Sequence, residues 1–180
     1  YVKKGTPIKK LIYGGEQEFN RRGGTTNVAG IVGFGKAMEL NIKNLDYTNK
    51  KIKELSTYFI KKVEYEIPDI KINGNLKQKV SSIVNISFDF VEGESILMLL
   101  DLEGIAVSTG SACASGSPEK SHVLKAMGLD AKDVNSAVRF SFGIDNTKEE
   151  IDYTVEVLAR AVTKLRAISA LNKKKKVVKK

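Results

Sequence analysis

The sequence predicts an α+β domain, built from a small, mostly antiparallel sheet with helices on one face and a long N-terminal helix leading in. Apolar residues recur at helical spacing over residues 27–65. Residues 80–88 and 137–142 are rich in β-branched and aromatic residues and alternate in polarity, as strands do. The order of helices and strands also fits a parallel α/β sheet, so the strand directions stay open at this point.

The first elements are a loop and the long helix. Residues 1–24 are rich in glycine and basic residues, which is typical of a loop. The helix over residues 27–65 ends before Pro68, because proline cannot continue it. Its three glycines, Gly30, Gly33 and Gly35, are costly in a helix and indicate that another backbone or a ligand approaches there.

Four further elements follow the strand at 80–88. Residues 94–102 form a short apolar helix closed by a glycine, and residues 105–108 form a short strand. A loop of small residues then covers 109–117. Ser117 followed by a proline predicts the N-cap of a helix that reaches Met127.

The last two elements are a strand and an amphipathic helix. Residues 137–142 alternate in polarity, so Arg139 is expected on the face opposite the core. Thr147 and Glu150 have the spacing of a capping box, which predicts the start of the last helix. Its apolar stripe runs from Ile151 to Ile168 at helical spacing.

Length and composition limit the class of protein. A chain of 180 residues with 42% hydrophobic residues suits one globular domain with a possible terminal extension. No segment reaches the roughly 20 apolar residues of a membrane span, and no signal peptide is visible. The single cysteine excludes an internal disulfide and fits a reducing compartment, so we expect a cytoplasmic protein without membrane contact. Because residues 1–4 carry no initiator methionine, we expect the chain to begin partway through a larger protein.

The net charge of +9 is concentrated at the C-terminus, where residues 173–180 contain six lysines. A solvated, disordered polylysine tail over residues 172–180 is the simplest interpretation. An electrostatic arm for an acidic partner or for nucleic acid is the alternative. No aromatic residues that could stack on bases occur among these lysines, so nucleic-acid binding is not favoured.

Cys113 is a candidate nucleophile. It lies in a segment, residues 108–117 (STGSACASGS), in which every neighbour is small. Nothing bulky shields the thiol, and a helix expected just after it would lower the thiol pKa. A buried structural cysteine is the competing interpretation, although such a cysteine usually has apolar neighbours.

Arg139 and Thr25 are candidate binding residues. The guanidinium of Arg139 is shaped to hold a carboxylate through two hydrogen bonds, but an ordinary exposed arginine fits the pattern equally well. Thr25 follows Arg21 and Arg22 and precedes the long helix, a place where hydroxyls, arginines and helix N–H groups can hold a phosphate. A plain threonine N-cap is the simpler explanation for Thr25.

No metal site is expected. His122 is the only histidine, and the sequence offers it no partner at zinc-ligand spacing. A surface or partly packed side chain is therefore the expected role of His122. A nucleophile pair with Cys113 is conceivable, but nothing in the sequence places the two residues in contact.

Four segments in order resemble the cysteine desulfurases of the NifS/IscS type. Residues 14–33 (GGEQEFNRRGGTTNVAGIVG) are similar to the family's glycine- and arginine-rich block, and residues 107–113 (VSTGSAC) resemble its active-site loop. Residues 121–128 (SHVLKAMG) and 138–143 (VRFSFG) resemble the two blocks that follow. Together they cover almost the whole chain apart from the tail, and the "GSAC" form resembles the NifS/IscS subgroup.

This resemblance implies an aminotransferase-like fold, pyridoxal phosphate as cofactor and L-cysteine as substrate. Cys113 would take the sulfur as a persulfide and alanine would be released. Arg139 would hold the substrate carboxylate, and Thr25 would contact the cofactor phosphate of the other subunit in a homodimer. The sulfur would pass to an acceptor or scaffold protein for iron-sulfur cluster or other thio-cofactor assembly.

One departure from the family bears on activity. The family's cofactor-binding lysine lies in a Ser-x-His-Lys block, and no such block occurs in this chain. The resemblance therefore implies residues 1–26 left from the large cofactor domain, a C-terminal small domain with its linking helix over residues 27–171, and the tail. The chain alone is expected to be inactive. A binding or scaffold module without catalysis and a selenocysteine lyase-like relative are the alternatives.

Overall fold

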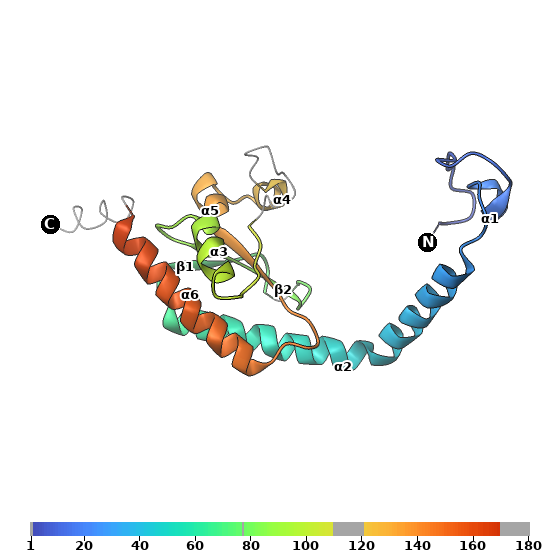
Figure 1. The fold of residues 1–180 in the computed structure, drawn as a ribbon. Coiled ribbons are helices and arrows are strands. Elements are labelled where there is room, and N and C mark those ends of the chain that lie inside the picture. The colour runs from blue at the N-terminus through green and yellow to red at the C-terminus, as the bar shows by residue number, and fades with distance from the viewer. Residues whose placement is uncertain (1, 77, 110–120, 170–180) are drawn as a thin grey trace. The chain divides into compact units, whose positions relative to one another are not determined.

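The computed structural model describes residues 2–76, 78–109 and 121–169. These fall into two compact units, Tyr1–Leu45 and Asp46–Lys180, which are described separately below. Figure 1 shows the order of the elements along the chain. The predicted division at residues 26 and 171 stays a prediction, and the polylysine tail lies outside the described residues.

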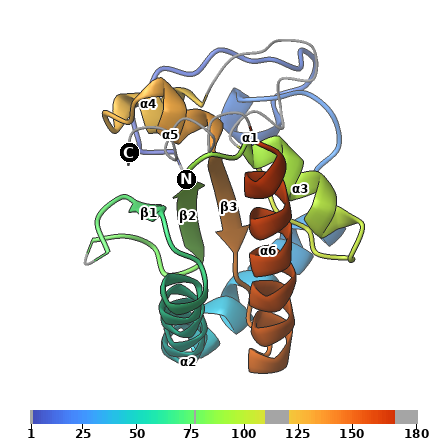
Figure 2. The same cartoon turned by 90° about the vertical axis from the view of Figure 1, so that its left-hand side faces the viewer.

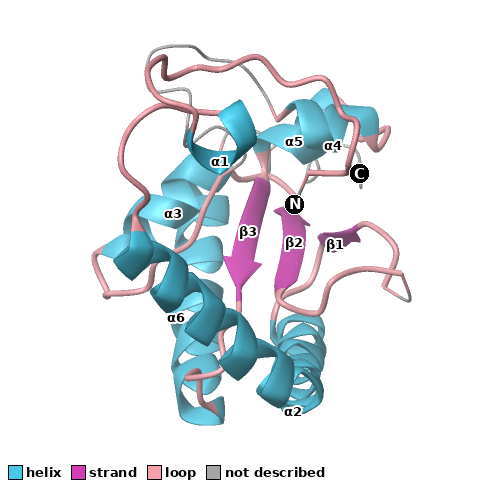
Figure 3. Ribbon diagram, turned by 90° about the vertical axis from the view of Figure 1, so that its right-hand side faces the viewer, coloured by secondary structure: helices cyan, strands magenta, loops and turns pink. Residues whose placement is uncertain are grey.

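The second unit contains a three-stranded antiparallel sheet in the order β1-β2-β3. Its strands are β1 (Ile70–Asn73), β2 (Ile83–Phe88) and β3 (Ala137–Ser141). Both neighbouring pairs are antiparallel, so the predicted antiparallel sheet is confirmed and the parallel alternative is wrong. Figures 2 and 3 show β2 and β3 side by side, with helix α6 running alongside them.

The main core lies on one face of this sheet. Helices α2 (Val28–Glu66), α3 (Gly93–Asp101) and α6 (Lys148–Ile168) contribute apolar side chains to it. The most completely buried core side chains are Phe59, Val63, Val84, Ile86, Phe88, Ile96, Leu100, Val138, Val155, Leu158 and Val162. This burial of alternate strand residues explains why the pattern of residues 80–88 and 137–142 was readable from the sequence.

The opposite face of the sheet is polar and only partly covered. Two short helices, α4 (His122–Ala126) and α5 (Ala131–Asn135), pack there around Leu124, Val134 and Ala137. The prediction of helices on one face alone is therefore incomplete. Much of the polar face stays accessible beside these helices, and Arg139 and Ser141 are exposed on it.

Helix α6 begins as the sequence predicts. The Thr147 hydroxyl accepts a hydrogen bond from the Glu150 N–H at 3.2 Å, and the Glu150 carboxylate accepts one from the Thr147 N–H at 3.2 Å. The two bonds satisfy donors that the first helical turn leaves without partners. The predicted capping box is confirmed.

Two predicted boundaries differ from the structure. Ser121, not Ser117, is the N-cap of α4, since its hydroxyl accepts from the Leu124 N–H at 3.3 Å and its backbone is not helical. Helix α4 is therefore shorter than the predicted helix ending at Met127, and Ser117 lies outside the described residues. The predicted strand over residues 105–108 is reduced to a single bridge from Ser108 to β3.

The first unit contains a turn of unusual hand. In α1 (Gln17–Asn20), the residues Glu18, Phe19 and Asn20 have φ of 53°, 58° and 64°. These values belong to the left-handed region, which costs an L-residue about 1–2 kcal/mol. The turn is followed by Gly23, where an added Cβ would lie 2.8 Å from the Gly14 backbone, so the two glycines permit a close backbone approach.

The first part of α2 is largely exposed in the described chain. Its exposed apolar side chains include Val28, Ile31, Val32 and Phe34. Apart from the neighbouring residues and the backbone of α2 itself, no described atom lies within 4 Å of the place where a Cβ would stand on Gly33 or Gly35. The close approach expected at these two glycines is therefore not found among residues 2–76, 78–109 and 121–169. Within the same ranges, no helix has both the length and the apolar character needed to cross a membrane.

Candidate active site

Arg139 lies in the middle of β3 with its side chain on the polar face. Its neighbours Val138 and Phe140 are 0% and 4% exposed and belong to the core, whereas Arg139 and Ser141 are exposed. The alternation predicted from the sequence is confirmed. Because the core side is closed by packing, a ligand can reach the guanidinium only from the polar face.

Ser108 is fixed to Arg139 by two backbone hydrogen bonds. The Arg139 N–H donates to the Ser108 carbonyl at 2.7 Å, and the Ser108 N–H donates to the Arg139 carbonyl at 3.1 Å. Both backbone groups of Arg139 thus point away from β2. Its register partner on β2, Asn85, is therefore its partner in a non-hydrogen-bonded pair. In such pairs the Cα atoms are only about 4.5 Å apart and the side chains lie on the same face.

The Arg139 guanidinium is available for a ligand. Among the described residues, no hydrogen bond or ion pair to its side chain is found. A guanidinium presents five N–H donors in a planar fork, and two of them match the spacing of carboxylate oxygens. The position of Arg139 thus suits a small carboxylate that approaches the open part of the polar face.

Three further polar side chains occupy the same face. Asn73 on β1 donates from Nδ2 to the Asn85 Oδ1 and to the Ser87 Oγ, both at 2.7 Å. Ser87 in turn donates to the backbone carbonyl of Asp133 on α5 at 2.7 Å. Asn73 is 7% exposed and Ser87 is 1% exposed, so this network is largely buried. The sequence alone does not reveal this network, because an asparagine before Gly74 has the pattern of a turn.

Cys113 lies outside the described residues. Its segment begins where Ser108 is held against Arg139, and Cys113 follows Ser108 by five residues. The sequence therefore connects the bridge partner of Arg139 directly to the segment that holds the candidate nucleophile.

Thr25 belongs to the first unit and is exposed. The side chain of Arg22 folds over this segment and donates to the carbonyls of Gly23, Gly24 and Thr25 at 3.1, 3.2 and 3.3 Å. The N-terminal cap of α2 is supplied by Asn27, whose Oδ1 accepts from the Gly30 N–H at 3.0 Å. The simpler explanation of Thr25 as the N-cap is therefore wrong. An exposed hydroxyl before a helix N-terminus and beside an arginine is chemically suited to a phosphate.

The candidate site residues are thus only partly brought together. The structure places Arg139 against Ser108, at the start of the Cys113 segment, and Thr25 in the other unit. His122 is exposed at the start of α4. Within the described ranges, no three His, Cys, Asp or Glu side chains are grouped as metal ligands.

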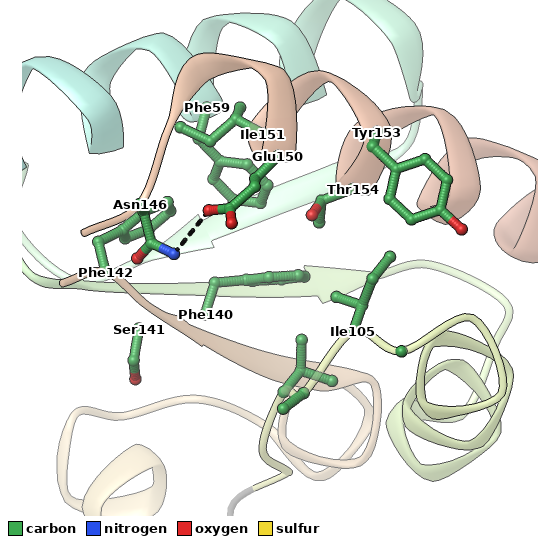
Figure 4. A pocket seen from close by; sticks show the side chains of 13 residues that line it. Phe59, Ile105, Phe140, Ser141, Phe142, Asn146, Glu150, Ile151, Tyr153 and Thr154 are labelled. Carbon is green, nitrogen blue, oxygen red and sulfur yellow. Dashed lines mark hydrogen bonds between the residues drawn. The ribbon is translucent and has the colours of Figure 1, made fainter.

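A cavity of about 340 Å³ lies between residues 104–107, the end of β3 and the start of α6. Figure 4 shows Phe140, Phe142 and Ile105 around it, while Ser141 points away. The Glu150 carboxylate at its edge accepts a hydrogen bond from Asn146 at 3.0 Å, and this bond lowers the Glu150 pKa. That carboxylate also caps α6, so its role is to stabilise the helix. The lining is otherwise mainly apolar, and Arg139 is not part of it.

Comparison of the sequence with known protein families identifies the class of protein that has this fold and site. The profile of the family described as Aminotransferase class-V matches residues 8–154. This match covers more than half of the chain, so the chain belongs to the aminotransferase class-V family.

Within that family, the similar proteins are cysteine desulfurases. "Cysteine desulfurase IscS" of Dictyoglomus turgidum is 49% identical over 180 residues, which are all of this chain and 46% of that protein. "Cysteine desulfurase IscS" of Methanosarcina thermophila is 43% identical over 97% of this chain and 43% of its own length. The chain therefore spans about half the length of the curated relatives it matches. The resemblance to NifS/IscS-type cysteine desulfurases is confirmed.

Solved structures agree with this assignment. A "NifS-like protein" has a TM-score of 0.78 and 33% identity, with 91% of this chain and 41% of the other covered. The NifS-like protein from Rickettsia africae has a TM-score of 0.75 and 31% identity, with coverages of 87% and 40%. The described fold is thus that of the corresponding part of NifS-like proteins.

Proposed function

We propose that the chain is the C-terminal part of a pyridoxal phosphate-dependent cysteine desulfurase. The full-length protein would convert L-cysteine to alanine and carry the sulfur on Cys113. The observation that carries this proposal is the pair of hydrogen bonds between Ser108 and Arg139. They hold the strand that carries Arg139 against Ser108, which precedes the only cysteine of the chain by five residues.

Arg139 would bind the substrate carboxylate. Two parallel N–H···O bonds to the carboxylate oxygens fix both the position and the direction of a small amino acid. The bound amino acid would then present its other groups away from β3. A lysine at this position would supply the charge without the planar fork, and so would orient the substrate less well.

Cys113 would accept the sulfur. Its thiolate attacks the sulfur of substrate cysteine, forming an S–S bond as the C–S bond breaks. The electron pair of the broken bond stays with the substrate carbon, which takes up a proton to give alanine. The product on the protein is a persulfide, and the total numbers of atoms and electrons are unchanged. Only the thiolate form of a cysteine is nucleophilic enough for this attack.

The cofactor would be held only in part by this chain. Pyridoxal phosphate, when bound, supplies the electron sink that lets the substrate C–S bond break. Thr25 and the N-terminus of α2 would contact its phosphate. The Ser-x-His-Lys block that binds the cofactor in the family does not occur in this chain. We therefore also propose that the 180-residue chain has no desulfurase activity by itself.

The setting of the full-length protein follows from the same proposal. It would act as a cytoplasmic homodimer, with Thr25 reaching the site of the other subunit. A sulfur-acceptor or scaffold protein would then receive the persulfide sulfur for iron-sulfur cluster or other thio-cofactor assembly.

The central test is a substitution of Cys113 in the full-length protein. Given L-cysteine, the unchanged protein should gain one sulfur on Cys113, as measured by intact-mass spectrometry, and should release alanine. Cys113→Ser should abolish both, and the cofactor absorption band should stay. Thr163→Ala, an exposed change on α6, is the matched control and should behave like the unchanged protein. Alanine release by Cys113→Ser at the normal rate would exclude Cys113 as the sulfur carrier.

The inactivity of the chain alone has a separate test. The 180-residue chain is mixed with pyridoxal phosphate, reduced with borohydride and mapped by peptide mass spectrometry. We expect only scattered, substoichiometric labelling of lysines and no alanine from cysteine. One lysine labelled to completion, together with alanine release, would show that this chain forms a working site.

A further inference from the structure

We propose that Asn85 is a second ligand-binding residue beside Arg139, and that the two side chains form a carboxylate site on the polar face of the sheet. Asn73 and Ser87 would be positioning residues, which fix the direction of the Asn85 amide. That the carboxylate belongs to the substrate cysteine rests on the proposed function. The binding of a carboxylate itself does not depend on it.

The direction of each amide follows from its partners. A backbone carbonyl only accepts hydrogen bonds, so the Ser87 hydroxyl must donate its hydrogen to Asp133. The Ser87 oxygen therefore accepts from Asn73, and the Asn73 atom facing it is the amide nitrogen. The second hydrogen of that nitrogen is directed at Asn85, so the Asn85 atom nearest to Asn73 is its oxygen.

This order leaves the Asn85 amide nitrogen pointing away from β1. Across β2, the register partner on that side is Arg139 on β3. The pair is of the non-hydrogen-bonded kind, in which side chains on the same face lie closest together. Among the described residues, the two N–H donors of Asn85 have no hydrogen-bond partner. The sheet thus presents amide and guanidinium donors next to each other.

The buried position of Asn73 supports a role in holding this arrangement. Its side chain is 7% exposed, and its Oδ1 has no hydrogen-bond partner among the described residues. A buried polar atom without a partner opposes folding, so packing alone does not explain an asparagine at this position. What Asn73 does provide is a pair of donors that lock the oxygen of Asn85 toward β1. Without that lock, the Asn85 amide could rotate and present its oxygen to the ligand.

The charge of the site matches a monocarboxylate. Arg139 supplies one positive charge, and Asn85 adds neutral donors. Lys71, which shares this face, is ion-paired with Asp133 and is not free to add a second charge. A carboxylate has about four lone-pair positions on its two oxygens, so it can accept two bonds from a guanidinium and a third from an amide.

The test uses the side-chain N–H signals of Asn85 and Arg139 in NMR spectra of the ¹⁵N-labelled 180-residue chain. Sodium acetate and L-alanine are the probes, and methylammonium chloride is the probe without a carboxylate. We expect both side chains to shift with one shared Kd for acetate and for alanine, and to stay unchanged with methylammonium. Movement of Arg139 alone, or of neither residue, would overturn the proposal.

Substitutions then separate ligand contact from folding. Asn85→Asp keeps the oxygen that Asn73 needs but removes both outward donors, so acetate affinity should fall roughly tenfold or more. Asn135→Ala, at an exposed asparagine of α5, should leave the affinity unchanged. Equal affinity in Asn85→Asp and the unchanged chain would overturn the proposal.

The positioning role of Asn73 needs a control for lost stability. Asn73→Ala should weaken acetate binding, whereas Val162→Ala, in the core on the other face of the sheet, should lower the Tm without changing the acetate Kd. Equal Kd values in both variants would remove Asn73 from the proposal. Failure of the full-length protein to make alanine would contradict the proposed function and leave these binding results standing. Failure of acetate to shift the Asn85 signals would contradict the carboxylate site and leave the proposed function standing.

Discussion

Ser108 and Arg139 hold each other through both of their backbone hydrogen bonds, at 2.7 and 3.1 Å. The bridge adds Ser108 to the sheet as a single paired residue beside β3, on the side away from β2. Ser108 is the first residue of the segment that contains Cys113. The strand that carries Arg139 therefore also fixes the position and direction of the backbone at Ser108, where that segment begins. A substitution that breaks this bridge should therefore loosen the backbone at Arg139.

Ser108→Pro tests this relationship. Proline has no N–H, so the bond to the Arg139 carbonyl is lost, and we expect a destabilisation of about 1 kcal/mol or more. Amide hydrogen exchange at Arg139 should become faster. Ser108→Ala is the matched control, because it removes only the hydroxyl that donates to the Thr109 carbonyl. If chemical denaturation and exchange give the same values for both variants, the bridge does not fix this strand.

Arg139→Ala should affect substrate use more than stability. The side chain has no partner among the described residues, so we expect the Tm to change little. In the full-length protein, kcat/KM for cysteine should fall by an amount equivalent to roughly 2–3 kcal/mol, because a charged pair of hydrogen bonds is lost. Arg139→Lys should recover part of the loss. Steady-state kinetics equal to those of the unchanged enzyme would remove Arg139 from the site.

Phe59→Ala should be severely destabilising. Phe59 is 1% exposed, and its ring lies 4.8 Å from that of Phe140 and 5.3 Å from that of Phe142, measured between centroids. Removing a buried phenylalanine side chain costs about 3–5 kcal/mol. Phe34→Ala makes the same change on the same helix at a residue that is 71% exposed, and should alter the free energy of unfolding by less than about 0.5 kcal/mol. Similar denaturation midpoints for the two variants would contradict the described core.

Asp152 should contribute a pH-dependent part of the stability. Hydrogen bonds from Lys62 and Tyr58 lower the Asp152 pKa. A carboxyl whose pKa is lower in the folded than in the unfolded state stabilises the fold at pH values above the unfolded pKa of about 3.9. That contribution is lost as the pH falls through the folded pKa.

Asp152→Asn should therefore be less stable than the unchanged chain at pH 7, and the difference should shrink below about pH 4. The effect should be small, because both Asp152 and Lys62 are partly exposed. Thermal melts between pH 2 and pH 7 provide the measurement. Asp46→Asn, an exposed change on α2, is the control and should give no such pattern. A difference that stays constant over this range would mean that the carboxylate charge contributes nothing.

Long periodic elements could be predicted from the sequence because the physical signal is repeated along them. In α6, the capping box at Thr147 and the stripe of buried residues point to the same helix. Strand β1 was missed because only four residues of it pair, directly after the turn that follows Pro68. The start of α4 was misplaced because a serine before a proline is a strong N-cap signal, whereas the non-helical backbone of Ser121 cannot be read from the sequence.

In the candidate site too, one residue could be predicted from the sequence and others could not. Arg139 could be located because it occupies a polar position in an alternating strand, and the structure places it on the face that this alternation requires. The partners of Asn85 could not be found, since strand register brings Asn73 opposite Asn85 across the intervening residues 74–84. The sequence does show a polar residue, Asn85, inside a β-branched strand. Its hydrogen-bond partner becomes clear only when the pairing of β1 with β2 is known.

The left-handed turn at Glu18, Phe19 and Asn20 changes which sequences this part of the fold can accept over evolutionary time. In a helix such as α6, a glycine costs about 1 kcal/mol relative to alanine, so drift toward glycine is opposed. At these three positions the preference is reversed, because glycine alone adopts positive φ without penalty. Any lineage that keeps side chains here does so against the backbone preference.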